Sequence, residues 1–88
     1  MTQPDVTVYT SDWCPYCRRA RELLSGKHVT FSEINVEDQP KFREEMIARS
    51  NRHAVPQIFV GDKHVGGCEE LYALERSGEL DRLIQGAG

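Results

Sequence analysis

The chain has 88 residues, of which 11 are basic and 14 acidic, and a formal net charge of -3 at neutral pH. This length favours one domain over residues 1–88, and the weak negative charge without a basic block argues against a nucleic-acid partner. The N-terminal residues show no signal-peptide pattern and no apolar segment approaches the length of a membrane span, so we expect a cytoplasmic protein without a membrane partner.

The first expected element is a strand, because residues 6–10 (VTVYT) alternate and are rich in β-branched and aromatic side chains. A helix is expected over residues 15–25, with Gly26 just past its last turn. Its apolar stripe consists of Cys17, Ala20 and Leu24. This places Cys14 at the N-terminus of the helix and Cys17 within the first turn.

A second strand is expected over residues 30–36, with Ile34 and Val36 on one face and Phe31 on the other. Asp38 is expected to cap a second helix, because a side-chain oxygen there accepts from the first free N–H groups. The buried side of this helix is expected to contain Phe42, Met46 and Ile47.

The remaining elements follow from turn signals. Residues 57–60 and 63–65 are expected to form a β-hairpin around a tight turn at residues 61–62, where a glycine tolerates φ > 0. The glycine pair 66–67 then ends the strand and starts a third helix, and a short last helix is expected over residues 79–85.

The resulting order is β-α-β-α-β-β-α-α. Its first half is a βαβ unit, whose right-handed crossover makes two strands parallel, and the hairpin adds an antiparallel pair. The sequence therefore predicts an α/β fold in which a four-stranded mixed sheet has helices on both faces.

Cys14 and Cys17 form a Cys-x-x-Cys motif at the first strand-to-helix junction. A thiolate attacks disulfides, so a redox cysteine needs a pKa below the usual value of about 8.5. The positive end of the helix and its free N–H groups favour a thiolate at Cys14, with Arg18 and Arg19 adding positive charge nearby. We therefore expect Cys14 to be the nucleophile and Cys17 to be the resolving thiol that releases the substrate.

Two other roles are open to these cysteines. His64 and Cys68 are spaced so that they complete a Cys3His zinc set with the motif, although a compact zinc module normally takes its ligands across a short spacer. A structural disulfide is disfavoured in a reducing compartment, and three cysteines without a secretion signal do not resemble a stapled extracellular domain. The context after a strand favours redox chemistry without a metal.

Three motifs together resemble a dithiol glutaredoxin of the thioredoxin-like superfamily: CPYC at 14–17, Val-Pro at 55–56, and Gly-Gly-Cys-Glu at 66–69. The similarity extends from about Val6 to Ile84. It implies a thioredoxin-like fold and a glutathione-dependent oxidoreductase that reduces protein disulfides and glutathione mixed disulfides. Glutathione is then a co-substrate, with no bound cofactor. We expect a monomer whose partners are glutathione and disulfide-bonded or glutathionylated proteins, with ribonucleotide reductase as a candidate.

The resemblance also implies which residues contact glutathione. They are Tyr16, Val55, Pro56, Gly67, Cys68 and Glu69. Tyr16 is expected to flank the tripeptide, and Val55 precedes a cis proline and pairs through its backbone with the cysteinyl part. The N–H groups of Gly67 and its neighbour suit the γ-glutamyl carboxylate, and Glu69 suits the adjacent ammonium.

Two positions depart from the family pattern. Ser11, followed by Asp12, stands where many glutaredoxins have Lys or Arg to hold the glycyl carboxylate, and Ala54 replaces a common Thr. We expect a residue at the end of the second helix to supply the missing contact. The candidates are Arg49, Arg52 and His53.

Two rival functions remain. One is a redoxin of the same fold that is reduced by thioredoxin reductase and feeds ribonucleotide reductase, against which the Gly-Gly-Cys-Glu motif argues. The other is a module with an iron-sulfur cluster on Cys14, ligated with glutathione and shared by a dimer, against which Pro15 argues.

Overall fold

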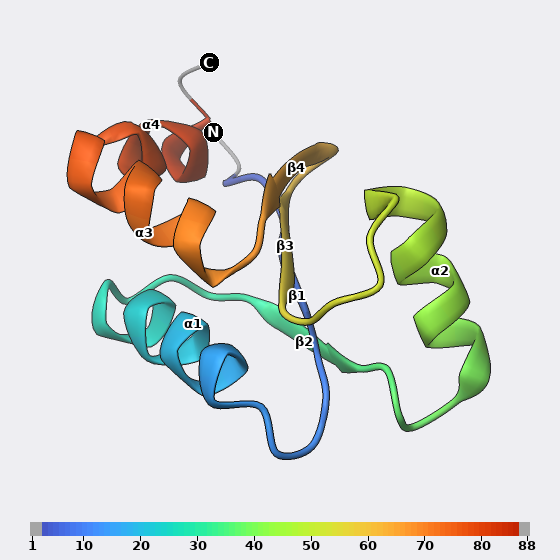
Figure 1. Cartoon of the computed structure of the whole chain (residues 1–88). Helices are drawn as coiled ribbons and strands as arrows, with labels where there is room; N and C mark the ends of the chain where they lie inside the picture. Colours follow the sequence, from blue (N-terminus) through green and yellow to red (C-terminus); the bar gives the residue numbers. More distant parts are fainter. Residues whose placement is uncertain (1–2, 87–88) are drawn as a thin grey trace.

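Four strands and four helices are present in the part of the chain that the structure describes, residues 3–86 of this computed structural model (Figure 1). In chain order they are β1 (Val6–Thr10), α1 (Pro15–Gly26), β2 (Ser32–Asn35), α2 (Pro40–Ser50), β3 (Gln57–Val60), β4 (Lys63–Gly66), α3 (Cys68–Ser77) and α4 (Glu79–Gln85). The types and order of the elements agree with those expected. Within the described residues, no helix is long and apolar enough to cross a membrane.

The strands form one mixed sheet in the order β2-β1-β3-β4. β1 and β2 are parallel, with Thr7 opposite Ser32, because the chain crosses over through α1 between them. β3 is antiparallel to both β1 and β4. Figure 1 shows α1, α3 and α4 on one side of the sheet and α2 on the other. The predicted four-stranded mixed sheet with helices on both faces is confirmed.

The alternation of side chains along β1 and β3 creates two cores, one on each face of the sheet. The core beneath α1, α3 and α4 contains Val6, Val8, Ala20, Leu24, Ile58, Val60, Leu71, Leu80 and Ile84. The smaller core beneath α2 contains Tyr9, Val36, Met46 and Phe59. As predicted, Phe31 packs against the first core while Ile34 and Val36 belong to the second.

Lys27 joins the end of α1 to the two C-terminal helices. Its ammonium lies 2.8 Å from a carboxylate oxygen of Glu75 in α3 and 2.7 Å from one of Asp81 in α4. These hydrogen bonds, to Asp81 first and then to Glu75, raise the pKa of Lys27. The contacts hold α1 against α3, and the N-termini of these two helices carry two of the three motifs.

Several expected details differ. Gly26 is the last residue of α1 rather than the one after it, and β2 covers only Ser32–Asn35, at the edge of the sheet beside β1. Asp38 does not cap α2. Its backbone N–H instead bonds to the Asn35 carbonyl oxygen in the preceding turn, and Gln39 occupies the cap position without a side-chain bond.

Phe42 is only partly buried, in contrast to the prediction for α2. It lies in the first turn of α2 beneath the Lys41 ammonium, 5.7 Å from its ring centre, and belongs to neither core. Met46 is the residue of α2 that is buried in the core beneath this helix, and Ile47 packs against it.

Candidate active site

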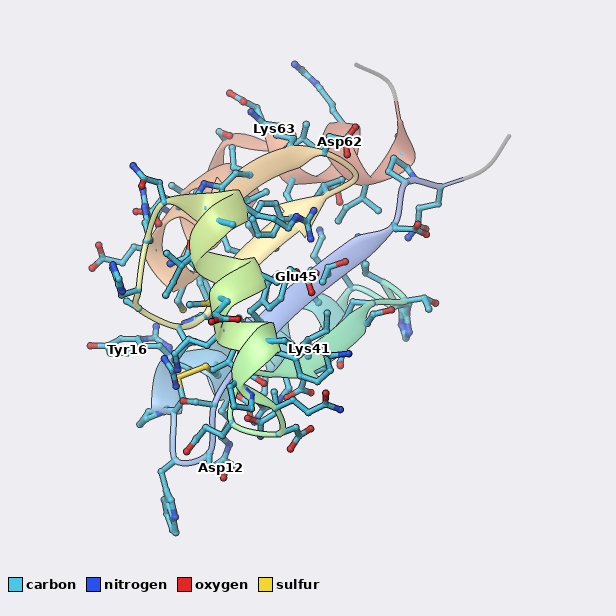
Figure 2. The ribbon with its side chains drawn as sticks, turned by 90° about the vertical axis from the view of Figure 1, so that its right-hand side faces the viewer. Asp12, Tyr16, Lys41, Glu45, Asp62 and Lys63 are labelled. Atoms are coloured by element: carbon cyan, nitrogen blue, oxygen red, sulfur yellow. A yellow bond between two sulfur atoms is a disulfide. The ribbon has the colours of Figure 1, made fainter. Side chains whose placement is uncertain are left out.

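Cys14 and Cys17 are joined by a disulfide at the start of α1. Cys14 occupies the cap position of the helix in an extended conformation, and the N–H of Cys17 donates to its sulfur at 3.1 Å. Cys17 is fully buried whereas Cys14 is partly exposed, so Cys14 is the more accessible of the two cysteines. Figure 2 shows this disulfide beside Tyr16, whose side chain is 57% exposed.

The loop before Cys14 carries acidic contacts and an exposed aromatic ring. The backbone N–H of Asp12 donates to a Glu37 carboxylate oxygen at 2.6 Å, and the Asn35 amide donates to the Asp12 carboxylate at 2.8 Å. Trp13 has φ 52° and is 99% exposed. Ser11, which stands where many glutaredoxins have a basic residue, is followed by Asp12 and its contact with Glu37. The Ser11 hydroxyl makes only a weak bond, to the Asp12 carbonyl oxygen at 3.3 Å.

The Val55-Pro56 loop lies beside the disulfide. Its peptide bond is cis, as the resemblance implies, and the Val55 carbonyl oxygen lies 3.9 Å from the Cys14 sulfur. Pro56 is buried, whereas Val55 is partly exposed. Cys14 and Val55 are 41 residues apart in the sequence. The sheet brings them together, because β1 leads into the first motif and its neighbour β3 follows the second.

The third motif forms the N-terminus of α3 next to the same loop. Gly66 has φ 119°, a left-handed value that favours glycine, and a side chain there would meet a Glu70 carboxylate oxygen at 2.6 Å. Gly67 is the cap residue, and a methyl group on it would lie 3.4 Å from the Pro56 carbonyl oxygen. The three motifs therefore meet: the first contacts the second through Cys14, and the second approaches the third through Pro56.

Glu70 and Arg52 form a contact in this region that the sequence did not predict. The Gly67 N–H donates to the Glu70 carboxylate at 2.6 Å, and the Arg52 guanidinium donates to it at 3.3 Å. The hydrogen bond from Gly67, followed by that from Arg52, lowers the pKa of Glu70. The spacing of an acidic residue three positions after a helix cap was the available signal.

Cys68 and Glu69 have different surroundings. Cys68 is buried, and burial raises the pKa of its thiol, while Glu69 is exposed. Both lie along an open cavity of about 570 Å³ between α1 and α3 that also borders Tyr16 and Arg19. The Arg19 guanidinium stands 5.3 Å from the ring centre of Tyr72 in this cavity.

The arginines named as candidates above have different surroundings, and only one of them lies at the N-terminus of α3. Arg18 lies 3.2 Å from Glu22 on α1, and Arg49 covers the Phe59 ring at 4.0 Å and donates to the Tyr9 hydroxyl at 3.0 Å. Arg49 therefore contacts Phe59 and Tyr9 in the core under α2. Arg52, by contrast, lies at the N-terminus of α3, where it forms an ion pair with Glu70.

His64 contacts Phe59 and Gln57 rather than the two cysteines of the CxxC motif. Its ring stacks on Phe59 with centres 4.9 Å apart, and Nε2 lies 2.7 Å from the side-chain oxygen of Gln57. Among residues 3–86, no group of three or more His, Cys, Asp or Glu side chains is placed to hold a metal ion. The four residues of the conceivable zinc set are therefore not assembled as ligands.

A CxxC disulfide at the start of a helix, beside a cis-proline loop on this mixed sheet, defines a thiol-disulfide oxidoreductase of the thioredoxin-like fold. The family model described as Glutaredoxin matches residues 6–65. The chain belongs to the glutaredoxin family, and its activity is glutathione-dependent thiol-disulfide oxidoreduction.

Similar proteins extend over nearly the whole chain. Glutaredoxin 3 of Escherichia coli K12 is 51% identical over 81 residues, covering 92% of this chain and 98% of that protein. A glutaredoxin of Pseudomonas aeruginosa is 49% identical over 81 residues, covering 92% and 96%. The solution structure of a glutaredoxin from Brucella melitensis, 48% identical, matches with a TM-score of 0.87 and covers 100% of this chain and 96% of that one.

Proposed function

We propose that the chain reduces glutathione mixed disulfides and protein disulfides with Cys14 as nucleophile and Cys17 as resolving thiol. The observation that carries this division is the unequal exposure of the two cysteines at the start of α1, where Cys14 is partly exposed and Cys17 is fully buried. The N–H of Cys17, 3.1 Å from the Cys14 sulfur, and the positive end of α1 favour negative charge on Cys14.

With a glutathione mixed disulfide, the Cys14 thiolate attacks the glutathione sulfur and the other thiolate leaves. A second glutathione thiolate then attacks the Cys14 adduct, which yields glutathione disulfide and restores the Cys14 thiolate. With a protein disulfide, Cys14 forms a mixed disulfide with one substrate sulfur, and Cys17 attacks Cys14 and releases the substrate as a dithiol. Two glutathiones then reduce the Cys14–Cys17 disulfide.

We propose that glutathione lies across the junction of the three motifs. The Val55 backbone, close to the Cys14 sulfur, is suited to pair with the cysteinyl part, and Tyr16 and Pro56 flank it. The N-terminus of α3 suits the γ-glutamyl carboxylate through the N–H of Cys68, since the Gly67 N–H donates to Glu70, while exposed Glu69 suits its ammonium. Support comes from the contacts that bring these segments together.

We assign the glycyl carboxylate to Arg52. The Ser11 position is unsuited to a carboxylate, because Asp12 and Glu37 make that side of the site acidic. Arg52 makes a single 3.3 Å contact with Glu70, which leaves its other guanidinium donors available. Because Arg52 is about half exposed, we expect Arg52→Ala to raise the apparent KM for glutathione only about 3-fold, with kcat nearly unchanged. The matched control is Arg82→Ala on α4. An unaltered KM in the Arg52 variant would remove this residue from the site.

We further propose that the reaction takes place in the cytoplasm, where the glutathione pool keeps the dithiol reduced, and that the chain acts as a monomer on protein disulfides such as that of ribonucleotide reductase. A dithiol that is oxidised to a disulfide in each cycle needs a reductant, and glutathione supplies it. Size-exclusion chromatography of the reduced protein tests the oligomeric state.

Electron supply is the direct test of the proposed function. We expect rapid turnover of a glutathione mixed disulfide when glutathione and glutathione reductase are the only reductants, and little turnover with thioredoxin reductase. The opposite preference would support the rival redoxin. Metal analysis and a visible absorption spectrum of anaerobically purified protein address the zinc and iron-sulfur alternatives in the same preparation, since the reaction above uses neither.

A further inference from the structure

A buried hydrogen-bonded chain lies behind the Val55-Pro56 loop. Gln57, the first residue of β3, is 1% exposed, and its side-chain amide donates to the Ala54 carbonyl oxygen at 2.9 Å. Its side-chain oxygen lies 2.7 Å from Nε2 of His64 on β4. The chain His64–Gln57–Ala54 therefore connects the hairpin with the segment next to the disulfide.

The Ala54 carbonyl and the Val55 N–H belong to one peptide unit. This bond is trans, since the only cis bond in the described residues is Val55-Pro56, and in a planar trans peptide the C=O and N–H point in opposite directions. When Gln57 holds the Ala54 oxygen on the buried side, the Val55 N–H is directed away from that side. This N–H is the donor that an extended substrate backbone needs at Val55.

The Ala54 carbonyl oxygen and His64 together fix which way the Gln57 amide faces. A carbonyl only accepts, so the amide NH₂ must face Ala54 and the amide oxygen must face the ring, where the Nε2–H tautomer of His64 donates to it and holds the amide in this orientation. The His64 ring is itself held by stacking on Phe59, at an interplanar angle of 29°. The charged groups around it are Arg49 and Arg52 from the α2 side and Glu70 from α3. Protonation of the ring keeps the Nε2–H donor, so the chain does not depend on the charge of His64.

We propose that Gln57 and His64 are positioning residues that aim the Val55 N–H at the backbone of the substrate and thereby favour disulfides carried on a peptide. This inference rests on the proposed function, in which Val55 pairs with the cysteinyl part of glutathione. The two residues touch neither the sulfur atoms nor, in this arrangement, the substrate. Their effect is on recognition of a peptide backbone, which a small disulfide lacks.

The decisive variant is Gln57→Glu. It preserves the size of the side chain and the acceptor for His64, but it places a carboxylate oxygen against the Ala54 oxygen. Two second-order rate constants are measured by stopped-flow fluorescence of Trp13, the only tryptophan and the neighbour of Cys14. One substrate is the mixed disulfide of glutathione with 2-mercaptoethanol, and the other is bis(2-hydroxyethyl) disulfide, which has no peptide backbone.

We expect the ratio of these two rate constants to fall about 5- to 10-fold in Gln57→Glu, as for one lost hydrogen bond with an unfavourable contact in its place. Gln85→Glu, an exposed change of the same kind on α4, keeps the wild-type ratio. Lowering the pH should bring the ratio in Gln57→Glu back toward the wild-type value, because the protonated carboxyl is again a donor to the Ala54 oxygen. A purely structural defect would not recover in this way.

His64→Phe provides a second route that retains the ring stack on Phe59. It removes only the donor to Gln57, so we expect a fall of about 2- to 3-fold in the same ratio. An unchanged ratio in both variants, or equal slowing with both substrates, would overturn the inference. Failure of the proposed function has a different signature, because the wild-type protein itself would then show no preference for the glutathione substrate.

Discussion

Cys14→Ser is expected to lower turnover at least about 1000-fold with both glutathione mixed disulfides and protein disulfides. A serine hydroxyl is not ionised near neutral pH and is a far weaker nucleophile than a thiolate, so no covalent intermediate forms. A 1000-fold loss corresponds to about 4 kcal/mol of activation free energy. Cys14 is the partly exposed cysteine that we expect to meet the substrate, and Cys17, fully buried, cannot replace it.

The same variant should fold normally, which separates lost chemistry from lost structure. Cys14 occupies the cap position of α1, where serine is among the favoured residues and its oxygen accepts the same Cys17 N–H. Thermal unfolding should therefore be compared under reducing conditions, in which the wild-type disulfide is also open. A residual rate above about one hundredth of wild type, from a well-folded sample, would contradict the role of Cys14.

The elements that the sequence predicted well are those with a strong local signal. β1 and α4 have the predicted bounds because alternation and helical spacing are properties of neighbouring residues. The cap of α2 was mispredicted because Asp38 is by residue type the better cap, whereas the turn after β2 uses Asp38 and leaves Gln39 at the cap position. Phe42 was expected inside because helical spacing alone cannot show which residues of the first turn of α2 reach the core, and Phe42 does not belong to it.

The active-site motifs were found because they are short and contiguous, but their supporting contacts were not. Glu70 follows Gly67 by three residues and had a recognisable capping spacing. The pairing of Gln57 with His64 depends on the hairpin register, which is irregular between Ile58 and Phe59. No periodicity in the sequence predicts such a shift, so contacts that depend on it required the structure.

Arg49 and Arg52 illustrate the same limit. Both were candidates for a substrate carboxylate because they lie near the end of α2 and carry the same charge. The structure places the Arg49 guanidinium over Phe59, in the core that α2 covers, and Arg52 at Glu70. Which arginine faces the site depends on how α2 packs against β3, a long-range feature that helix spacing does not contain.

Cys17→Ser is expected to separate the two reactions of the protein. Reduction of a protein disulfide should fall by at least about 10-fold, because the mixed disulfide between Cys14 and the substrate then lacks its internal nucleophile. Turnover of a glutathione mixed disulfide should stay within about 3-fold of wild type, since a second glutathione attacks the Cys14 adduct directly. The buried position of Cys17, next to the Cys14 sulfur but away from solvent, is the structural reason for this division.

The measurement uses one preparation and two substrates, with glutathione and glutathione reductase as the reductant in both assays. Insulin serves as the protein disulfide, and the glutathione adduct of 2-mercaptoethanol as the mixed disulfide. Mass spectrometry of the Cys17→Ser protein trapped during insulin reduction should show the substrate attached at Cys14, because the step that normally releases it is missing. Equal losses with both substrates would show that Cys17 acts in the first attack, and a trapped adduct at Cys68 would move the nucleophile away from the start of α1.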